Sequence, residues 1–352
     1  MSRQSAKRFG GKDMLQHIDL ARFLFGEMIP FRREALRHSK GENNMIVCCG
    51  EALIDMLPRT SKEGAAVYQP FNGGSIYNTA IALGRLGIIT GYFSGLSTDF
   101  FGDSLKAGLT ASNVDLKYTK IWDKPSTLAF VKLDNGQARY SFFDDNSAGR
   151  MLTKKDLPKL SSDVNALHFG SFSLINDPGA STLEALMERE AKQRVICFDP
   201  NIRPTLVNNR SDYLARINRL IAICDILKIS DEDVMWITGK TDLASAARKW
   251  LNAGAKVVVI TKGENGVEAF TKGISIKLPS VNVKVVDTVG AGDTFTAGFL
   301  ASLQRAGKLS KAAISYLDEA SLRNAVSYAA KAAAITVSRA GANPPWVHEL
   351  QS

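Results

Sequence analysis

Hydrophobic and polar positions along the chain follow two periods. Short apolar runs typical of buried strands recur at 45–49, 89–94, 128–133, 165–170, 194–198, 225–229 and 256–260. Between several of them lie patterns with the 3.6-residue period of amphipathic helices, at 75–86, 179–192, 211–223, 242–252 and 293–306. Strands that alternate with helices predict an α/β fold of three layers, a mostly parallel sheet flanked by helices on both faces.

Two stretches depart from this alternation of strands and helices. Residues 64–72 and 126–143 are short, aromatic and alternating, and Asp134-Asn-Gly-Gln137 has the composition of a hairpin turn. They predict a small lid of antiparallel β strands beside the main sheet.

The first 44 residues differ from the rest in their hydrophobic pattern. They hold no β-rich run, and the first buried-strand pattern begins abruptly at Met45. Nine Lys or Arg against five Asp or Glu give them a balance of +4, which leaves +5 of the chain's +9 to the other 308 residues. We therefore predict an N-terminal extension of unassigned role at 1–44 and a single functional domain at 45–352.

Composition narrows the class of protein. A hydrophobic content of 45% and a charged content of 22% are globular values. No apolar run approaches the roughly 18 residues of a membrane span, so no membrane partner is expected. The basic N-terminal segment lacks interleaved aromatic residues, which argues against a nucleic-acid partner. The four Cys have no CxxC spacing, which indicates neither a zinc ribbon nor a disulfide scaffold and favours a reducing cytoplasm.

The most informative segment is Asp287-Thr-Val-Gly-Ala-Gly-Asp-Thr-Phe-Thr-Ala-Gly298. Its small residues at 290–292 let backbone N–H groups converge just where an apolar helical stripe begins. A helix N-terminus beside such a loop suits a transferring phosphoryl group. Asp293 lies at this entrance, where a carboxylate could accept the proton of a substrate hydroxyl. The alternative is that Asp293 is an ordinary helix N-cap and that the glycines only make a turn.

The same segment resembles the second signature of the ribokinase-like, or PfkB, carbohydrate kinases. Their first signature is matched by Gly73-Gly-Ser-Ile-Tyr-Asn-Thr-Ala-Ile-Ala-Leu-Gly-Arg-Leu-Gly87, and the similarity covers essentially all of 45–352. The resemblance implies the ribokinase-like fold and in-line phosphoryl transfer from ATP to a primary alcohol. Asp293 would be the general base, and the backbone amides of Gly290, Ala291, Gly292 and Asp293 would neutralise charge on the transferred group.

The resemblance also assigns the sugar site. Gly73, Gly74 and Asn78 meet the sugar in this family. Asp55, in Gly50-Glu-Ala-Leu-Ile-Asp55, matches the acid at the end of the first strand that holds sugar hydroxyls. Arg203, in Asp199-Pro-Asn-Ile-Arg203, lies near phosphate or substrate, since a guanidinium suits phosphate or carboxylate; a surface salt bridge is the alternative. Closure of the lid over the sugar would exclude water.

For the nucleotide, Thr261-Lys-Gly-Glu-Asn-Gly266 resembles the family's nucleotide loop, which assigns Thr261, Gly263 and Gly266 to ATP; a plain turn is the alternative. The segment from Lys228 to Asp233 matches the family's Asn-x-x-Glu region near Mg²⁺, with Ser230 for Asn and Asp233 for Glu. That change keeps an oxygen-rich site for water-bound Mg²⁺. The match assigns Lys228 and Ser230 to the nucleotide and Asp233 to the Mg²⁺ region. Asp287 has two interpretations, a ligand of a monovalent cation such as K⁺, or a structural hydrogen bond to its loop.

Several subfamilies share these signatures. The opening Gly-Glu-Ala-Leu-Ile-Asp-Met and the form of the first signature most resemble bacterial fructokinases, which makes fructose the expected acceptor and fructose 6-phosphate the product. A 2-keto-3-deoxygluconate kinase is the closest competitor because Arg203 could bind a carboxylate. Ribokinase, adenosine kinase and a non-enzymatic sugar- or nucleotide-binding regulator are three further candidates. Lid strands of this family often pair between subunits, so the resemblance also allows a homodimer.

Overall fold

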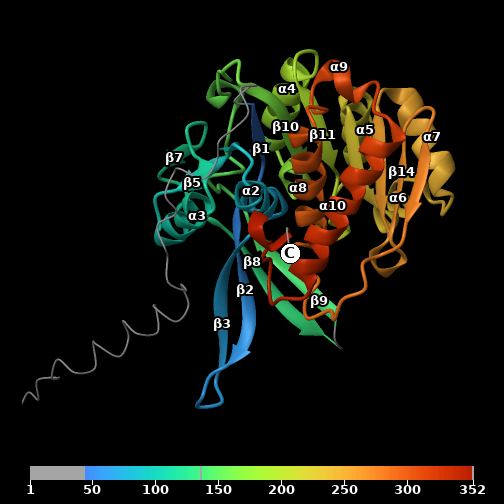
Figure 1. Ribbon diagram of the computed structural model, residues 1–352. Coiled ribbons are helices and arrows are strands. Elements are labelled where there is room, and N and C mark those ends of the chain that lie inside the picture. Colours follow the sequence, from blue (N-terminus) through green and yellow to red (C-terminus); the bar gives the residue numbers. More distant parts are fainter. Residues whose placement is uncertain (1–43, 135–136, 351–352) are drawn as a thin grey trace, which may run out of the picture. The chain divides into compact units, whose positions relative to one another are not determined.

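The computed structural model describes residues 44–134 and 137–350. The predicted N-terminal extension therefore lies outside the described residues, except for Asn44. Within them, a nine-stranded sheet has the order β15-β14-β13-β12-β11-β10-β1-β4-β6 (Figure 1). Only β14 pairs antiparallel with its neighbours, and all the other pairs are parallel. The bounds are β1 Met45–Cys49, β4 Thr90–Phe93, β6 Val114–Asp115, β10 Val164–Gly170, β11 Val195–Asp199, β12 Ile226–Ser230, β13 Val257–Thr261, β14 Val267–Phe270 and β15 Ser275–Leu278.

Helices cover both faces of this sheet, which confirms the predicted fold class. The sheet divides its side chains between two cores with a period of two: Ile46 and Cys48 of β1 enter one core, and Val47 and Cys49 enter the other. The first core is closed by α2 (Ser75–Arg85), α3 (Phe100–Ala111), α8 (Ala291–Arg305), α9 (Lys311–Ile314) and α10 (Glu319–Val337). The second is closed by α4 (Gly179–Glu190), α5 (Arg210–Ile223), α6 (Asp231–Thr238) and α7 (Leu243–Ala253).

Helix α8 packs between α2 and α10, and Figure 1 shows the three on one side of the sheet. The contact with α10 is close because Gly298 has no side chain: a Cβ there would lie 2.8 Å from the Cα of Ala329. This packing carries the start of α8 to the start of α2, although the two are more than 200 residues apart in sequence.

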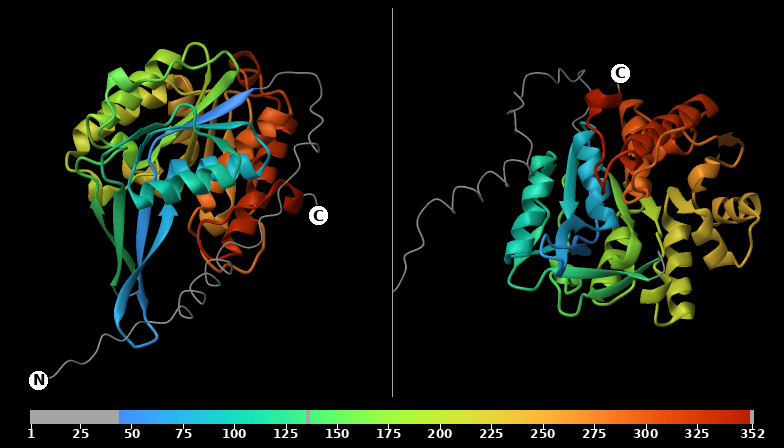
Figure 2. Two further views of the ribbon diagram at one scale, coloured as in Figure 1. Left: turned by 90° about the vertical axis from the view of Figure 1, so that its left-hand side faces the viewer. Right: turned by 90° about the horizontal axis from the view of Figure 1, so that it is seen from below.

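The second sheet has four strands in the order β3-β2-β8-β9, and its strands project beyond the main body (Figures 1 and 2). They are β2 Leu53–Thr60, β3 Ala66–Gly73, β8 Thr127–Asp134 and β9 Gln137–Phe143. The outer pairs are antiparallel, as predicted, but the central pair β2–β8 is parallel, which the sequence did not predict. The register places Asp134 opposite Gln137; the predicted turn positions 135 and 136 lie outside the described residues.

The predicted strand runs do not include β2, nor β6, β14 and β15 of the main sheet, nor the short β5 (Gly95–Ser97) and β7 (Lys120–Trp122). For the site β2 matters most, because the sequence places Asp55 at the end of the first strand. In the structure β1 ends at Cys49, and Asp55 lies within β2. The half-exposed end of β2 and its Pro58 weaken any strand pattern there, and Pro58 lies in the part of β2 that pairs only with β3. A two-stranded sheet of β5 and β7 completes the fold. No helix among the described residues is long and apolar enough to cross a membrane.

Candidate active site

The loop before α8 forms a turn that only glycine adopts readily. Gly290 has φ 76° and is the N-cap of α8, and a Cβ on it would lie 2.7 Å from the Cβ of Ala342. Of the amides predicted to face a phosphoryl group, that of Ala291 donates to Thr288 O at 3.3 Å. The N–H groups of Gly290, Gly292 and Asp293 have no partner within the described residues. Three amides at the positive end of a helix therefore remain free for an anion.

Asp293 is not the N-cap of its own helix, so that alternative is wrong. Its carboxylate, 8% exposed, instead faces α2. Oδ1 accepts a hydrogen bond from Ser75 Oγ at 2.6 Å, and Oδ2 accepts one from Asn78 Nδ2 at 2.9 Å. Burial raises the pKa of Asp293, and the two hydrogen bonds and the charge of Lys228 only partly offset this. Asn78, expected at the sugar, thus holds Asp293.

The residues predicted for the sugar lie around the same carboxylate. Burial raises the pKa of Asp55 to about 6, opposed by the charge of Arg203 and assisted by that of Asp293. A Cβ on Gly73 would come within 2.2 Å of Asp55 Oδ2, so any larger residue here would displace the Asp55 carboxylate. Arg203 is not a surface salt bridge among the described residues; it donates to Asn201 Oδ1 at 2.7 Å and to two backbone oxygens of its own loop.

Lys228 lies against the first turn of α8. Its ammonium is 2.8 Å from Asp199 Oδ2, and a Cβ on Gly292 would lie 3.0 Å from its Nζ. Burial alone would lower the pKa of Lys228, but the charge of Asp199 and the hydrogen bond to it raise the pKa above the ordinary value. The ammonium therefore stays charged next to the free amides of α8.

The predicted metal region is rich in oxygen atoms, but two of them already accept hydrogen bonds from backbone amides. Ser230 caps α6 by accepting from the amide of Asp233, and Asp233 Oδ1 accepts from Ile202 N at 3.2 Å. Burial raises the pKa of Asp233 to about 6. Asp199 Oδ1 is buried without a hydrogen-bond partner in the described part of the chain. No group of three or more His, Cys, Asp or Glu in that same part is placed to hold a metal by itself.

Four further predicted residues, Thr261, Gly263, Gly266 and Asp287, lie at the end of β13 or in loops. Thr261 ends β13, and the turn after it places Gly263 at φ 53° and Gly266 at φ 84°. A Cβ on Gly266 would lie 2.2 Å from Leu278 O, so this loop requires glycine for conformation and for space. Asp287 accepts from Val289 N at 3.0 Å and from Gly341 N at 2.8 Å. Both of its oxygens hold loops together, which is the structural interpretation of Asp287.

Sequence reasoning missed Glu51, Ser75 and Asp199 as site residues. Ser75 and Asp199 lie inside motifs that were recognised, so a closer comparison of those motifs could have found them. Glu51 carried only a weak signal, an acid directly after a buried strand. Its carboxylate is 5% exposed and accepts from Ser75 N at 2.9 Å.

Comparison with known proteins agrees with this geometry. The family described as pfkB family carbohydrate kinase matches residues 43–349. A fructokinase of Rhizobium leguminosarum bv. trifolii is 54% identical over 280 residues, 80% of this chain and 86% of the relative. Fructokinase of Xylella fastidiosa with bound ATP superposes with a TM-score of 0.80 at 27% identity, covering 87% of this chain and 97% of that one. Aminoimidazole riboside kinase of Salmonella enterica, complexed with aminoimidazole riboside and an ATP analog, superposes with a TM-score of 0.76 at 25% identity, covering 88% of this chain and 99% of that one.

Proposed function

Because the chain belongs to the pfkB family of carbohydrate kinases, and is an ATP-dependent sugar kinase, we propose that its acceptor is fructose and its product fructose 6-phosphate. One observation carries the chemistry: a buried carboxylate, Asp293, lies beside three free amides at the start of α8. The 54% identity to a protein named fructokinase supports the choice of sugar.

Asp293 acts as the general base in this proposal. Its carboxylate accepts the proton of the primary hydroxyl as the oxygen of that hydroxyl attacks the γ-phosphorus of ATP, and ADP leaves with the electrons of the broken P–O bond. Burial helps because a carboxylate with a raised pKa is a stronger base. The hydrogen bonds from Ser75 and Asn78 fix both oxygens, so that the carboxylate does not rotate away from the hydroxyl.

Charge on the transferred phosphoryl group is met by the amides of Gly292 and Asp293, and by the ammonium of Lys228 below them. Fixed donors in a site from which water is excluded are worth more than the same donors in solution. Gly290 shapes this loop and also offers a free N–H, whereas the N–H of Ala291 is used within the turn.

The sugar is bound on the other side of Asp293. Asp55 accepts hydrogen bonds from its hydroxyls, and Gly73 and Gly74 leave space for the ring. Arg203 closes the site at the end of the segment after β11. The small sheet acts as a lid; its exposed apolar side chains include Tyr68, Phe71 and Tyr140.

Thr261, Gly263 and Gly266 approach the nucleotide in this proposal. The unpartnered oxygen of Asp199, with Asp233 and Ser230, fits a Mg²⁺ ion held through water, because Mg²⁺ keeps several waters and takes oxygen ligands. Mg²⁺ would neutralise charge on the nucleotide phosphates. K⁺ near Asp287, a homodimer through the lid strands and a cytoplasmic location stay predictions.

The choice of sugar is tested by a coupled assay of ADP release with fructose, ribose, adenosine and 2-keto-3-deoxygluconate at fixed ATP. We expect the highest kcat/KM with fructose. A higher value with 2-keto-3-deoxygluconate would assign Arg203 to a substrate carboxylate, and turnover with none of them would favour the regulator.

A further inference from the structure

Helix α2 begins without the usual side-chain cap. Its N-cap, Gly74, has φ 107° and makes no side-chain hydrogen bond. A side chain at this position would be strained, and its Cβ would lie 2.9 Å from the backbone oxygen of Glu51. The first N–H groups of a helix need partners from outside the helix, so here they must come from another part of the fold.

Glu51 supplies those partners from the segment between β1 and β2. Its Oε1 accepts from Ser75 N at 2.9 Å, and its backbone oxygen accepts from Tyr77 N at 3.2 Å. A carboxylate at this end of a helix is also favoured by the helix dipole. One residue therefore fixes the first turn of α2 twice.

That first turn is the part of α2 that holds Asp293. Ser75 donates its backbone N–H to Glu51 and its hydroxyl to Asp293 Oδ1, so it links the two carboxylates directly. Asn78, one turn later, donates to the other oxygen of Asp293. A shift of the start of α2 would move both donors away from the carboxylate together.

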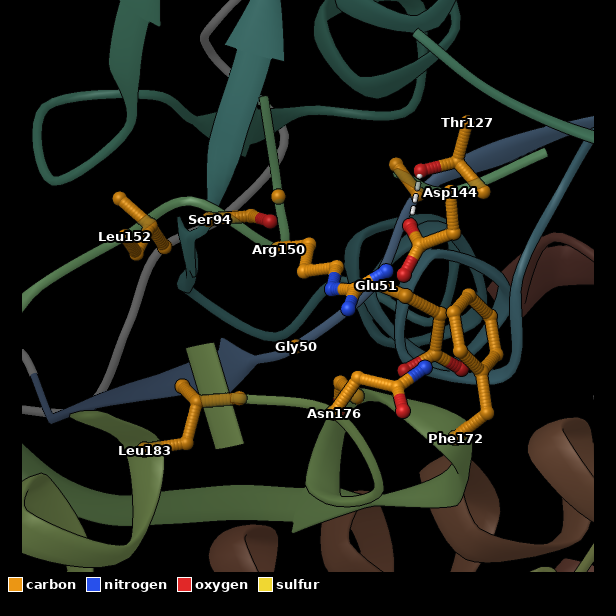
Figure 3. Close-up of a pocket in the computed structure, with 13 residues that line it drawn as sticks. Gly50, Glu51, Ser94, Thr127, Asp144, Arg150, Leu152, Phe172, Asn176 and Leu183 are labelled. Carbon is orange, nitrogen blue, oxygen red and sulfur yellow. Dashed lines mark hydrogen bonds between the residues drawn. The ribbon is translucent and has the colours of Figure 1, made fainter. Parts of the chain in front are cut away.

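The second oxygen of Glu51 is not used to cap α2. Oε2 is buried and has no hydrogen-bond partner in the described part of the chain. Glu51 lines a cavity of about 20 Å³, which is room for one water molecule. Figure 3 shows it there between Arg150 and Asn176, with Asp144 close by. A buried carboxyl that keeps one oxygen free costs stability, so its retention beside the reacting groups points to a role in the reaction.

We propose that Glu51 is a positioning residue for phosphoryl transfer: it anchors the start of α2 and, through Ser75, sets the orientation and basicity of Asp293. The proposal rests on the proposed function, because it needs Asp293 as the base. Burial raises the pKa of Glu51 to about 7; the nearby hydroxyls of Ser171 and Ser173 oppose this shift and the charge of Asp293 assists it. By the same repulsion, an ionised Glu51 raises the pKa of Asp293. The other titratable groups facing Glu51 are Tyr92 of β4, Tyr213 of α5, Asp144 and Arg150.

The experiment measures kcat, both KM values and the pH dependence of kcat/KM for Glu51→Ala, Glu51→Gln and Ser75→Ala. Glu51→Ala removes the anchor, and we expect kcat to fall about tenfold or more with the KM for ATP within about twofold. Glu51→Gln keeps an oxygen for Ser75 N and should restore kcat at the optimum to within about threefold of the wild type.

The pH profile separates positioning from simple support of the fold. Glu51→Gln removes the charge that Glu51 carries above its pKa of about 7, so the part of the kcat/KM profile that depends on this ionisation, near pH 7, should disappear. Ser75→Ala removes a hydrogen bond to the charged form, so the acid limb should move to higher pH, by about one to two units. Glu184→Gln, another buried glutamate held by arginines on α5, is the matched control and should leave the acid limb in place.

Wild-type kcat and a wild-type pH profile near pH 7 in both Glu51 variants would overturn the proposal. So would a raised KM for the sugar at unchanged kcat, which would make Glu51 a sugar ligand. If Glu51→Ala does not fold, Glu51→Gln decides through its pH profile near pH 7. Asp293→Asn belongs in the same series: near-normal kcat there would refute the base itself, whereas an inactive Asp293→Asn with normal Glu51 variants would refute only this inference.

Discussion

Replacing Asp293 with Asn is the most direct test of the chemistry. The change removes the basic oxygen but hardly alters size. The surroundings can accept the amide: Ser75 Oγ can rotate to accept from the new NH₂ group, while the new carbonyl oxygen accepts from Asn78 Nδ2. Removing a buried charge with a raised pKa also relieves a desolvation cost, so we expect no loss of thermal stability.

Activity should respond very differently. General base catalysis is worth roughly 10² to 10⁴ in rate, which corresponds to about 3–5 kcal/mol of activation free energy. We expect kcat to fall by that factor, with the ATP dissociation constant, measured by calorimetry, within about threefold of the wild type. Asp225→Asn is the matched control: Asp225 is also buried, but it pairs with Lys311 at the opposite end of β12, and its kcat should hold even if its Tm falls. A kcat for Asp293→Asn within about tenfold of the wild type would refute the reasoning.

Three further predictions concern the sugar site, pH and the domain boundary. Gly73→Ala would push a methyl group into Asp55, so its KM for sugar should rise about tenfold with the KM for ATP unchanged; an unaltered sugar KM would contradict the contact. Protonation of Asp55 below its pKa of about 6 should lower kcat/KM, and so should protonation of Asp293, whose pKa is also raised. As the pH falls from 6 to about 4, the contribution of Asp55 to the free energy of unfolding should rise, because its pKa is higher in the folded than in the unfolded protein. Chemical denaturation at each pH would show whether activity is instead lost by unfolding. A chain that starts at residue 43, which keeps the hydrogen bond between Asn44 O and Gln304, should retain kcat and both KM values, and a large loss would assign residues 1–42 a part in the reaction.

The local hydrophobic pattern was enough to predict much of the main sheet. Buried runs such as 225–229 and 256–260 became β12 and β13 within one residue, because strands buried on both faces are continuously apolar. The pattern failed where an element is stabilised mainly by its partners. β2 is half-exposed and contains a proline, so only pairing with β3 and β8 defines it.

The same division applies to the site. Gly290 and Asp293 were predicted from a single segment, since a glycine turn and the helix that follows are neighbours in sequence. The donors to Asp293 were not predicted in that role, because Ser75 and Asn78 lie 218 and 215 residues away from it. Glu51 was missed because its function is to cap a helix that begins 24 residues later.

The sequence by itself determined the fold class, the family and the loop that would meet a phosphoryl group, since all three depend on short-range periodicity and on contiguous motifs. Only the tertiary structure decided which groups surround the base. Packing of α8 against α2 sets the two donors on Asp293, and burial there raises its pKa. Desolvation and hydrogen bonding depend on what lies close in space, and a linear pattern does not carry that information.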